Sequence, residues 1–586
     1  MNKLWAIAPK IPSSRFAKFP QYHPLLLQLL YNRGIKTKKA IEDFLSIDYA
    51  KDVNDPYLLS DMKKAVFRIK KAIEIKEKIA IFGDYDADGI CAATIINDVL
   101  KKIGIVPIVY IPERKKGYGM NNEAIQELAN NGVSLIITVD CGVGDYQEIV
   151  LANKLGIDVI ITDHHLFSAK TPPAYVILNP KKKNETYPNK DLSATGVAYK
   201  LATALIKEYQ DHFKEGEEKW LLDLVSIATV ADMMPLLNEN RTLVKYGFLV
   251  LAKTRRLGIK TLLKEAGVKD IKVKWIDKAQ SRFLIENIDA YTIGFVIGPR
   301  LNAAGRMDHA NTAFYLLNTS SRQEALKLAK ELNRKNQARQ TLQKKIIEQI
   351  KKTLDSAEIE EKKVIIKGGK DYPKGIVGLI SGKLTDEFYV PSFIYKKEKN
   401  TSRGSCRGIP EVNIVDILKQ CSSCLEDYGG HKAAGGFLVK NSNIKKLTEC
   451  LEKSVKEIIG DKKLLPKLNI DAKLDFQDIS YGLKKTLEEL APFGQGNREP
   501  IFMIENALTV EKKAIGKKGQ HLSLRLKKIE NGKDCYLRAL LFENTKTSKE
   551  IEVLKHYDFA FVPLFDEWQG KKRVTLKILD WKLSKN

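Results

Sequence analysis

Apolar positions along the chain fall into short runs and longer helical repeats, and the alternation of the two outlines a fold. Apolar runs at 79–82, 135–139 and 159–162 are each followed by a loop or a stretch with helical periodicity. Strands that alternate with helices over short connections predict a parallel β-sheet covered by helices. The apolar stretches 198–209 and 220–234 are expected to complete this α/β unit.

The pattern changes three times further along the chain. Residues 321–353 contain no Gly or Pro and are rich in Lys, Gln, Arg and Leu, which predicts one helix about 50 Å long. A second α/β unit is expected from 364–366 to a glycine-rich turn at 429–436. After about residue 465, short alternating segments such as 522–526 and 574–578 predict a small β-barrel.

The expected fold is therefore an α/β protein with several domains. The chain of 586 residues is too long for one hydrophobic core. We predict five parts: a helical lead-in (1–50), a parallel-sheet domain (51–320), a connecting helix (321–356), a second α/β domain (357–462) and a small β-barrel (463–586).

Composition narrows the setting of the protein. No run of 18 apolar residues and no signal-like N-terminal segment is present, which predicts a cytoplasmic protein without a membrane span. Seven scattered cysteines predict reduced thiols rather than a disulfide framework. Cys421 and Cys424 form a lone CxxC, which is too small a set for a structural zinc site.

The charge balance indicates a polyanionic partner. Lys and Arg total 98 against 72 Asp and Glu, a formal net charge of +26. Such a field gathers polyanions, and nucleic acid is the natural candidate.

Within this basic chain, acidic residues concentrate after the first predicted strand. Asp84, Asp86 and Asp88 alternate with other residues, and Gly89 closes the run. Three adjacent carboxylates repel one another unless a cation neutralises them. The run therefore predicts a hard divalent metal ion at the carboxyl end of a strand, where open α/β sheets place their sites.

Three further stations repeat this arrangement. Asp140 follows the run 135–139, Asp163-His164-His165 follows the run 159–162, and Asp232 lies within an apolar stretch. A buried aspartate needs a partner such as a metal. Oxygen-rich ligation with one or two imidazoles suits Mn²⁺ or Mg²⁺, and the carboxylates suffice for two ions about 4 Å apart.

These four stations match the successive motifs of the DHH phosphoesterase superfamily. Further segments resemble the RecJ family of single-stranded-DNA-specific 5′→3′ exonucleases within it, at 111–119, 298–306, 429–436 and 492–497. The resemblance spans nearly the whole chain. It implies an oligonucleotide-binding (OB) fold for the barrel and an enzyme that hydrolyses phosphodiester bonds to release 5′-mononucleotides in DNA repair and recombination.

The resemblance also implies roles for individual residues. Asp84 and Asp86 would hold one ion, Asp88, His164 and Asp232 the other, and Asp140 would bridge the two. His165 would contact the scissile phosphate. Substrate contacts are expected from both α/β units and their connections: Arg114, Tyr118, Arg300, Asn302, Arg306, Ser405, Arg407 and His431. Of these, Ser405, Arg407 and Arg114 would clamp the 5′ phosphate.

Two departures from the family pattern lie in the second α/β unit. Gly408 stands where the family usually has a second serine. Tyr372-Pro373-Lys374-Gly375 stands where the family usually shows Trp-His-Pro-Gly. Neither departure removes an expected metal ligand.

Two other functions stay open at this point. One is a DHH–DHHA1 phosphodiesterase of short oligonucleotides or cyclic dinucleotides, which needs no C-terminal barrel. The other is a non-catalytic nucleic-acid-binding scaffold. No Gly-x-x-x-x-Gly-Lys-Ser/Thr loop is present, so an ATP-driven motor is not expected. The expected partner is single-stranded DNA, with a helicase and a single-strand-binding protein as candidate partners of a monomer.

Overall fold

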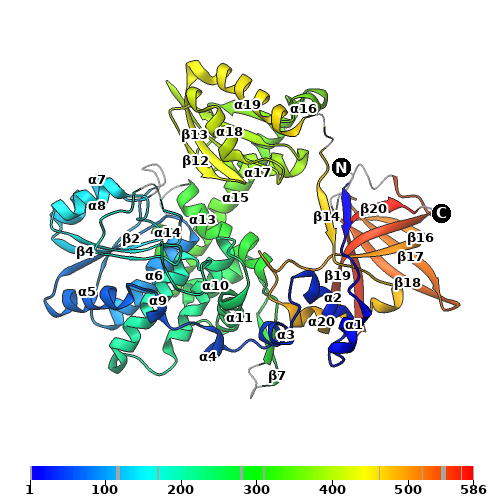
Figure 1. Cartoon of the computed structure of the whole chain (residues 1–586), viewed down its shortest axis with the longest axis horizontal. Helices are drawn as coiled ribbons and strands as arrows, with labels where there is room; N and C mark the ends of the chain where they lie inside the picture. Colours follow the sequence, from blue (N-terminus) through cyan, green and yellow to red (C-terminus); the bar gives the residue numbers. More distant parts are fainter. Residues whose placement is uncertain are drawn as a thin grey trace.

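The computed structural model describes residues 3–113, 119–167, 170–277, 282–307, 311–460, 462, 464–517, 519–542, 550–568 and 571–584. Figure 1 shows three lobes. The first lobe (49–318) runs from blue to green, the second (356–460) is yellow, and the third (464–584) is orange to red. The N-terminal residues, in dark blue, lie against the third lobe, so both chain ends lie on that side.

The first lobe contains the predicted parallel sheet, in the strand order β3-β2-β4-β5-β6. Along β2, Ile79 and Ile81 face one hydrophobic core while Ala80 and Phe82 face another, as strand alternation requires. Helices therefore cover both faces. The strands are β2 (Lys78–Gly83), β3 (Ile108–Tyr110), β4 (Val133–Val139), β5 (Asp158–Thr162) and β6 (Val176–Leu178).

Capping residues set where the covering helices begin. Asp86 accepts hydrogen bonds from the backbone N–H groups of Asp88 and Gly89, so the helix that follows β2 begins at Ala87. Ser193 caps the helix predicted from 198, which begins at Ala194. The helices are α4 (Tyr49–Asp52), α5 (Met62–Glu74), α6 (Ala87–Lys102), α7 (Asn122–Asn130), α8 (Tyr146–Lys154) and α9 (Ala194–Glu208).

A helical layer completes the first lobe and carries a two-stranded hairpin, β7 (Lys272–Asp277) and β8 (Arg282–Glu286). Within it, α10 (Leu222–Ala231) is buried on all sides up to Val230, which explains its continuous apolar sequence. The other helices are α11 (Asn238–Ala252), α12 (Leu257–Glu265), the π-helix η5 (Thr292–Ile297), α13 (Gly298–Met307) and α14 (Asn311–Asn318).

The long helix predicted at 321–353 is confirmed as α15 (Arg322–Lys352), with Ser321 as its N-cap. Its first half contributes Ala325, Ala329 and Leu332 to the core of the first lobe. Its second half contributes Ile346 and Ile350 to the core of the second lobe. One continuous helix therefore joins two separate cores.

The second lobe has a mixed sheet in the order β12-β13-β11-β10-β9, in which only β9 and β10 pair in parallel. The glycine-rich segment expected as a turn instead forms most of the hairpin β12–β13, because its backbone groups pair across the strands. The elements are α16 (Ser356–Lys362), β9 (Ile365–Gly369), α17 (Val377–Phe388), β10 (Ser392–Lys397), β11 (Thr401–Arg407), α18 (Ile414–Gln420), β12 (Asp427–His431), β13 (Ala434–Lys440) and α19 (Ile444–Ile459).

A disulfide links the end of α18 to α19 through Cys421 and Cys450. The expectation of reduced thiols throughout is therefore wrong for this pair. The two cysteines are 29 residues apart in the sequence, and only the packing of the helices brings them together. Cys424 is a free cysteine, so the CxxC spacing itself forms no bridge.

The third lobe is the predicted barrel, in which five long strands close through the pairing of β16 with β19. The N-terminal helices share its hydrophobic core, with Leu26 and Leu30 in the same cluster as Phe502 and Phe559. The elements are β14 (Lys467–Ile470), β15 (Ala472–Lys473), α20 (Gly482–Leu490), β16 (Phe502–Ile515), β17 (His521–Glu530), β18 (Lys533–Leu541), β19 (His556–Trp568) and β20 (Lys571–Leu583).

The expected helical lead-in consists of α1 (Ser13–Lys18), α2 (Pro24–Asn32) and α3 (Lys38–Leu45), preceded by the strand β1 (Leu4–Ile7). β1 pairs in parallel with β14, which leads from the second lobe into the barrel. Trp5 fixes this strand further by donating its indole N–H to Asp580. Among the described helices, none has the length and apolar character needed to cross a membrane.

Candidate metal centre

The four predicted stations meet at the carboxyl edge of the parallel sheet. Asp84 and Asp86 follow β2, Asp140 follows β4, and His164 follows β5. Asp232 reaches the same place from the end of α10. Parallel strands bring their carboxyl ends to one edge, so residues up to 148 positions apart in the chain become neighbours.

The backbone at these positions is built for close approach. A Cβ atom on Gly89 would lie 2.6 Å from the backbone oxygen of Asp84, so only glycine allows the acidic loop to fold back on α6. Asp140 has a φ of 64°, in the left-handed region that aspartate tolerates better than most residues. This conformation turns the chain directly after β4 and leaves the Asp140 side chain at the cluster.

The side chains form three overlapping groups whose potential ligand atoms lie within 4.8 Å of one another. His164 Nε2 lies 3.4 Å from Asp140 Oδ1, 3.5 Å from Asp232 Oδ2 and 3.9 Å from Asp88 Oδ2. Asp140 belongs to two of the groups. The groups are Asp84 with Asp86 and Asp140; Asp88 with His164 and Asp232; and Asp140 with His164 and His165.

Asp88 is anchored by the start of a neighbouring helix. Its two carboxylate oxygens accept hydrogen bonds from the backbone N–H groups of Ala194 (2.8 Å) and Thr195 (2.7 Å) in α9. The N-terminal end of a helix stabilises negative charge. The Asp88 carboxylate is therefore fixed in orientation, with an edge toward His164.

Burial and mutual repulsion keep protons in the metal-free cluster. Burial and the nearby carboxylates of Asp86, Asp88 and Asp84 raise the pKa of Asp140 well above its usual range. Burial, with Asp88 and Asp86, raises the pKa of Asp232 to about 9. Burial also lowers the pKa of His164, which leaves a neutral imidazole. A divalent cation would relieve this repulsion, and the donor set of aspartates with one imidazole fits Mn²⁺ or Mg²⁺.

The sequence did not assign a role to Asp163, although it lies in the Asp-His-His triplet. Asp163 is fully buried and accepts a hydrogen bond from the His164 N–H (2.7 Å). Its carboxylate also lies 2.8 Å from His165 Nδ1. Burial alone would lower the pKa of His165, but this hydrogen bond raises it above the usual histidine value. Asp163 therefore orients a half-exposed, readily protonated His165 beside the cluster.

Asn302, a predicted substrate contact, supports the acidic loop through its side-chain oxygen. Asn302 Oδ1 accepts a hydrogen bond from the Ala87 N–H at 2.7 Å. Nearby, a Cβ on Gly305 would lie 2.7 Å from the Tyr85 oxygen, so α13 packs directly on the loop. The segment 298–306 therefore supports the loop that carries the acidic residues of the metal centre.

Two of the arginines predicted to contact substrate, Arg300 and Arg306, have hydrogen-bond partners in different parts of the molecule. Arg300 donates hydrogen bonds to Val296 O in η5 and to Asn333 Oδ1 in α15. Arg306 donates to the Gly375 oxygen at 2.8 Å, which connects the first and second lobes. Arg114 and Tyr118 lie outside the described residues.

Ser405 and Arg407 lie together on β11, as expected. Arg407 Nη1 donates to Ser405 Oγ (3.2 Å) and to the Cys406 oxygen (2.9 Å). Among the described residues no carboxylate forms an ion pair with Arg407. Gly378 leaves room here, because a Cβ on it would lie 3.0 Å from Ser405 Oγ. His431, by contrast, is exposed at the end of β12.

The structure explains one departure from the family pattern. A Cβ at position 408 would lie 2.7 Å from Ile414 Cγ1, so a serine there would require Ile414 to move. At the other departure, Lys374 pairs with Glu398 at 3.0 Å beside the contact between Gly375 and Arg306. Both departures therefore lie in the second lobe, and neither involves a residue of the carboxylate cluster.

Comparison with known proteins adds the family. Residues 78–229 match the N-terminal domain of the DHH family, residues 361–458 the DHHA1 domain and residues 470–580 the RecJ OB domain. The chain is 33% identical over 563 residues to the single-stranded-DNA-specific exonuclease RecJ of Bacillus subtilis, covering 95% of this chain and 68% of that protein. It is 29% identical over 529 residues to the Escherichia coli RecJ, covering 87% of each.

Solved structures agree with this assignment. The crystal structure of RecJ from Thermus thermophilus in complex with Mn²⁺ has the same fold, with a TM-score of 0.81 at 23% identity, over 100% of this chain and 80% of that one. A second, of an exonuclease RecJ bound to manganese, has a TM-score of 0.57 at 28% identity, over 68% of this chain and 94% of that one. The chain belongs to the RecJ family.

Proposed function

We propose that this protein is a metal-dependent exonuclease that hydrolyses single-stranded DNA from the 5′ end and releases 5′-mononucleotides. The observation that carries this proposal is the presence of two adjacent ligand groups at the carboxyl edge of the sheet, with Asp140 of the first group 3.4 Å from His164 of the second. Two further findings support it. The relatives are named single-stranded-DNA-specific exonucleases, and the two related crystal structures contain manganese.

In the proposed site, Asp84, Asp86 and Asp140 hold one ion. Asp88, His164 and Asp232 would hold the second. Asp140, whose Oδ1 lies 3.4 Å from His164 Nε2, is proposed to serve both. Two bound cations supply an acidified water and neutralise charge on the phosphate. The protein contributes orientation: Asp88 is fixed by α9, and the neutral His164 offers a ring nitrogen.

His165 is proposed to contact the scissile phosphate. Its Nδ1 lies 2.8 Å from the Asp163 carboxylate, which fixes the ring beside the cluster. Its raised pKa favours the protonated ring, which stabilises the charge that develops on the phosphate oxygens. Asp163 is then a positioning residue for His165.

The 5′ phosphate is proposed to bind Ser405 and Arg407. An arginine fork binds phosphate through two hydrogen bonds, which distinguishes a terminal phosphate from an internal one. The barrel would hold the rest of the strand. A groove of about 400 Å³ there is lined by Lys513, Arg525, Tyr536 and Arg538. The Arg525 guanidinium lies 4.5 Å from the centre of the Tyr536 ring, which gives the groove both charge and a surface for base stacking.

The test is product analysis on a 5′-phosphorylated single strand labelled separately at each end, with Mn²⁺ added or chelated. We expect early release of the 5′ label alone, as a mononucleotide, and only with Mn²⁺. Hydrolysis of dinucleotides with an intact long strand would indicate the short-oligonucleotide phosphodiesterase instead. Tight strand binding without metal-dependent turnover would indicate a scaffold.

A DNA substrate makes the cytoplasm the proposed location. A monomeric state, and a helicase or single-strand-binding protein as partner, stay predictions.

A further inference from the structure

The segment 492–497, which joins α20 to the barrel, makes its closest contacts with the first lobe. The Leu236 N–H donates a hydrogen bond of 2.7 Å to the Gln495 oxygen. A Cβ on Gly494 would lie 2.6 Å from Leu236 Cδ1, and one on Gly496 would lie 3.2 Å from Pro235 Cβ. Leu236 is almost fully buried at this contact. The glycines therefore allow the barrel side to approach the segment that follows Asp232.

The segment is itself rigid. Asn497 is fully buried, and its side-chain amide donates to the oxygens of Leu490 (2.8 Å) and Pro492 (2.9 Å). Backbone hydrogen bonds between Gly494 and Asn497 close the turn in both directions. Arg33 of α2 donates to Asn497 Oδ1 at 2.8 Å, which ties the turn to the N-terminal helices. The barrel lobe thus presents a fixed surface to Leu236.

A second contact holds the two lobes in the same place. Arg241 of α11 is buried, and its guanidinium donates to the backbone oxygens of Leu490 (2.8 Å) and Glu489 (3.3 Å). These are the last carbonyls of α20, where a cation is favourable. The same guanidinium lies 4.0 Å from the centre of the Phe44 ring. The joint is therefore formed by Leu236 and Arg241 on one side and residues 489–497 on the other.

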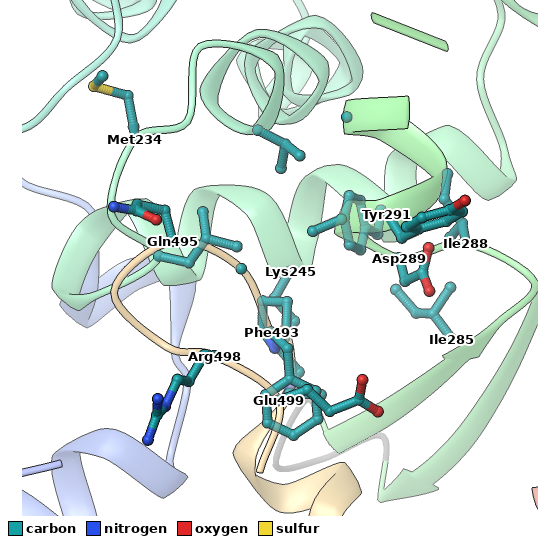
Figure 2. Close-up of a pocket in the computed structure, with 18 of the residues that line it drawn as sticks. Met234, Lys245, Ile285, Ile288, Asp289, Tyr291, Phe493, Gln495, Arg498 and Glu499 are labelled. Carbon is teal, nitrogen blue, oxygen red and sulfur yellow. The ribbon is translucent and has the colours of Figure 1, made fainter. Parts of the chain in front are cut away.

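On the metal side, Asp232 lies at the end of a helix and begins an irregular segment. Its N–H bonds to the Ala228 oxygen, and Met233 then takes a φ of 57°. A cavity of about 640 Å³ lies beside this segment, lined by Met233, Met234 and Leu236 together with Phe493 and Gln495. Figure 2 shows Phe493, Gln495 and Arg498 on the barrel-side loop at this cavity, with Met234 on the first-lobe side. Because this cavity lies on one side of the segment that follows Asp232, the position of the segment depends on its contact with residues 489–497.

We propose that the turn at 494–496 is a positioning element that holds Asp232 in place for the second metal ion through its contact with Leu236. This inference rests on the proposed role of Asp232 as a ligand. It makes the barrel part of the metal centre as well as a strand-binding surface. Residues that orient metal ligands typically affect metal affinity by about 10- to 100-fold.

The test is Mn²⁺ binding to the full chain without DNA, followed by the electron paramagnetic resonance signal of free Mn²⁺. Gly494→Ala and Gly494→Val place a methyl or larger group against Leu236. The matched control is Gly482→Ala at the start of α20, where the new Cβ meets only Ser480 Oγ, at 3.3 Å. Asp232→Asn is the reference for loss of the ligand.

We expect about 10-fold weaker binding of one of the two ions in Gly494→Ala, a larger loss in Gly494→Val and wild-type binding in Gly482→Ala. Circular dichroism establishes that each variant is folded. Wild-type affinity for both ions in a folded Gly494 variant would overturn the positioning role. Failure of both Gly494 variants to fold would also overturn it, because the turn would then be a folding element.

Asp232→Asn separates this inference from the proposed function. If Asp232→Asn loses one ion while the Gly494 variants bind both normally, only the positioning role fails. If Asp232→Asn itself binds both ions with wild-type affinity, the ligand assignment fails and the inference fails with it.

Discussion

The carboxylate cluster and the Ser405–Arg407 pair both lie on β-sheets, but the two sites hold their charges in opposite ways. In the cluster, Asp84, Asp88 and Asp140 are almost fully buried, and burial together with the neighbouring carboxylates raises the pKa of Asp140. In the second lobe, Arg407 is half-buried and hydrogen-bonds only neutral groups, Ser405 and a backbone oxygen. The carboxylate cluster is therefore suited to bind metal cations, whereas Arg407 is suited to bind an anion.

The sheets themselves explain this contrast. The parallel sheet of the first lobe collects all its strand ends at one edge, which concentrates side chains from distant parts of the chain. The mixed sheet of the second lobe presents Arg403, Ser405 and Arg407 in alternate positions on one face of a single strand. One architecture builds a compact multi-residue centre, and the other builds a linear surface.

The strongest test of this contrast is Asp140→Ala. Because Asp140 is grouped with Asp84 and Asp86 and also lies 3.4 Å from His164 of the second group, its loss should lower exonuclease activity by about 10³-fold or more and weaken binding of both Mn²⁺ ions. The measurement is release of 5′ label from a phosphorylated single strand. Asp211→Ala, at an exposed aspartate of the same lobe, is the control and should retain activity. Equal activity in the two variants would remove Asp140 from the centre.

A smaller effect is expected at the linear surface. Arg407→Ala should lower kcat/KM on a 5′-phosphorylated strand by roughly 10- to 100-fold, since a charged hydrogen-bonding pair is lost, and should change a 5′-hydroxyl strand little. Metal affinity should stay at the wild-type value. Arg403→Ala, four residues away on the same face of β11, is the matched control. Equal losses on both kinds of strand would show that Arg407 does not read the terminal phosphate.

The smallest expected effect is a change of the thermal unfolding midpoint with pH. In the metal-free protein the pKa of Asp232 is raised to about 9, against about 3.9 in an unfolded chain. The folded state then binds protons more tightly, so stability falls as pH rises between these values. We expect the thermal midpoint with chelator to fall by a few degrees from about pH 6 to about pH 9, and Mn²⁺ to stabilise more at the higher pH.

Asp232→Asn should flatten this pH dependence, because the amide does not titrate. Thermal unfolding of the wild type and of Asp232→Asn, each with chelator and with Mn²⁺, makes the comparison. The same slope in both proteins would show that Asp232 does not carry the proton.

Much of the candidate site could be predicted because it depends on local pattern. Three of the four carboxylate stations follow a short apolar run, and parallel strands place such ends together whatever the details of packing. The long helix α15 and the barrel strands also follow directly from periodicity. The hydrogen bonds that Asn302 and Arg300 make within the protein could not be predicted in this way, because motif membership does not specify which way a side chain points.

The sequence alone thus determined the order of the elements, the concentration of acidic residues at strand ends and the basic character of the chain. Only the tertiary structure decided that residues 4–45 pack with the barrel, that Cys421 meets Cys450, and that Asp163 orients His165. It also decided the joint between Leu236 and Gln495. That contact is a backbone hydrogen bond between residues 259 positions apart in the chain. Because it is made by backbone N–H and C=O groups, which nearly all residues have, no pattern of side chains could predict it.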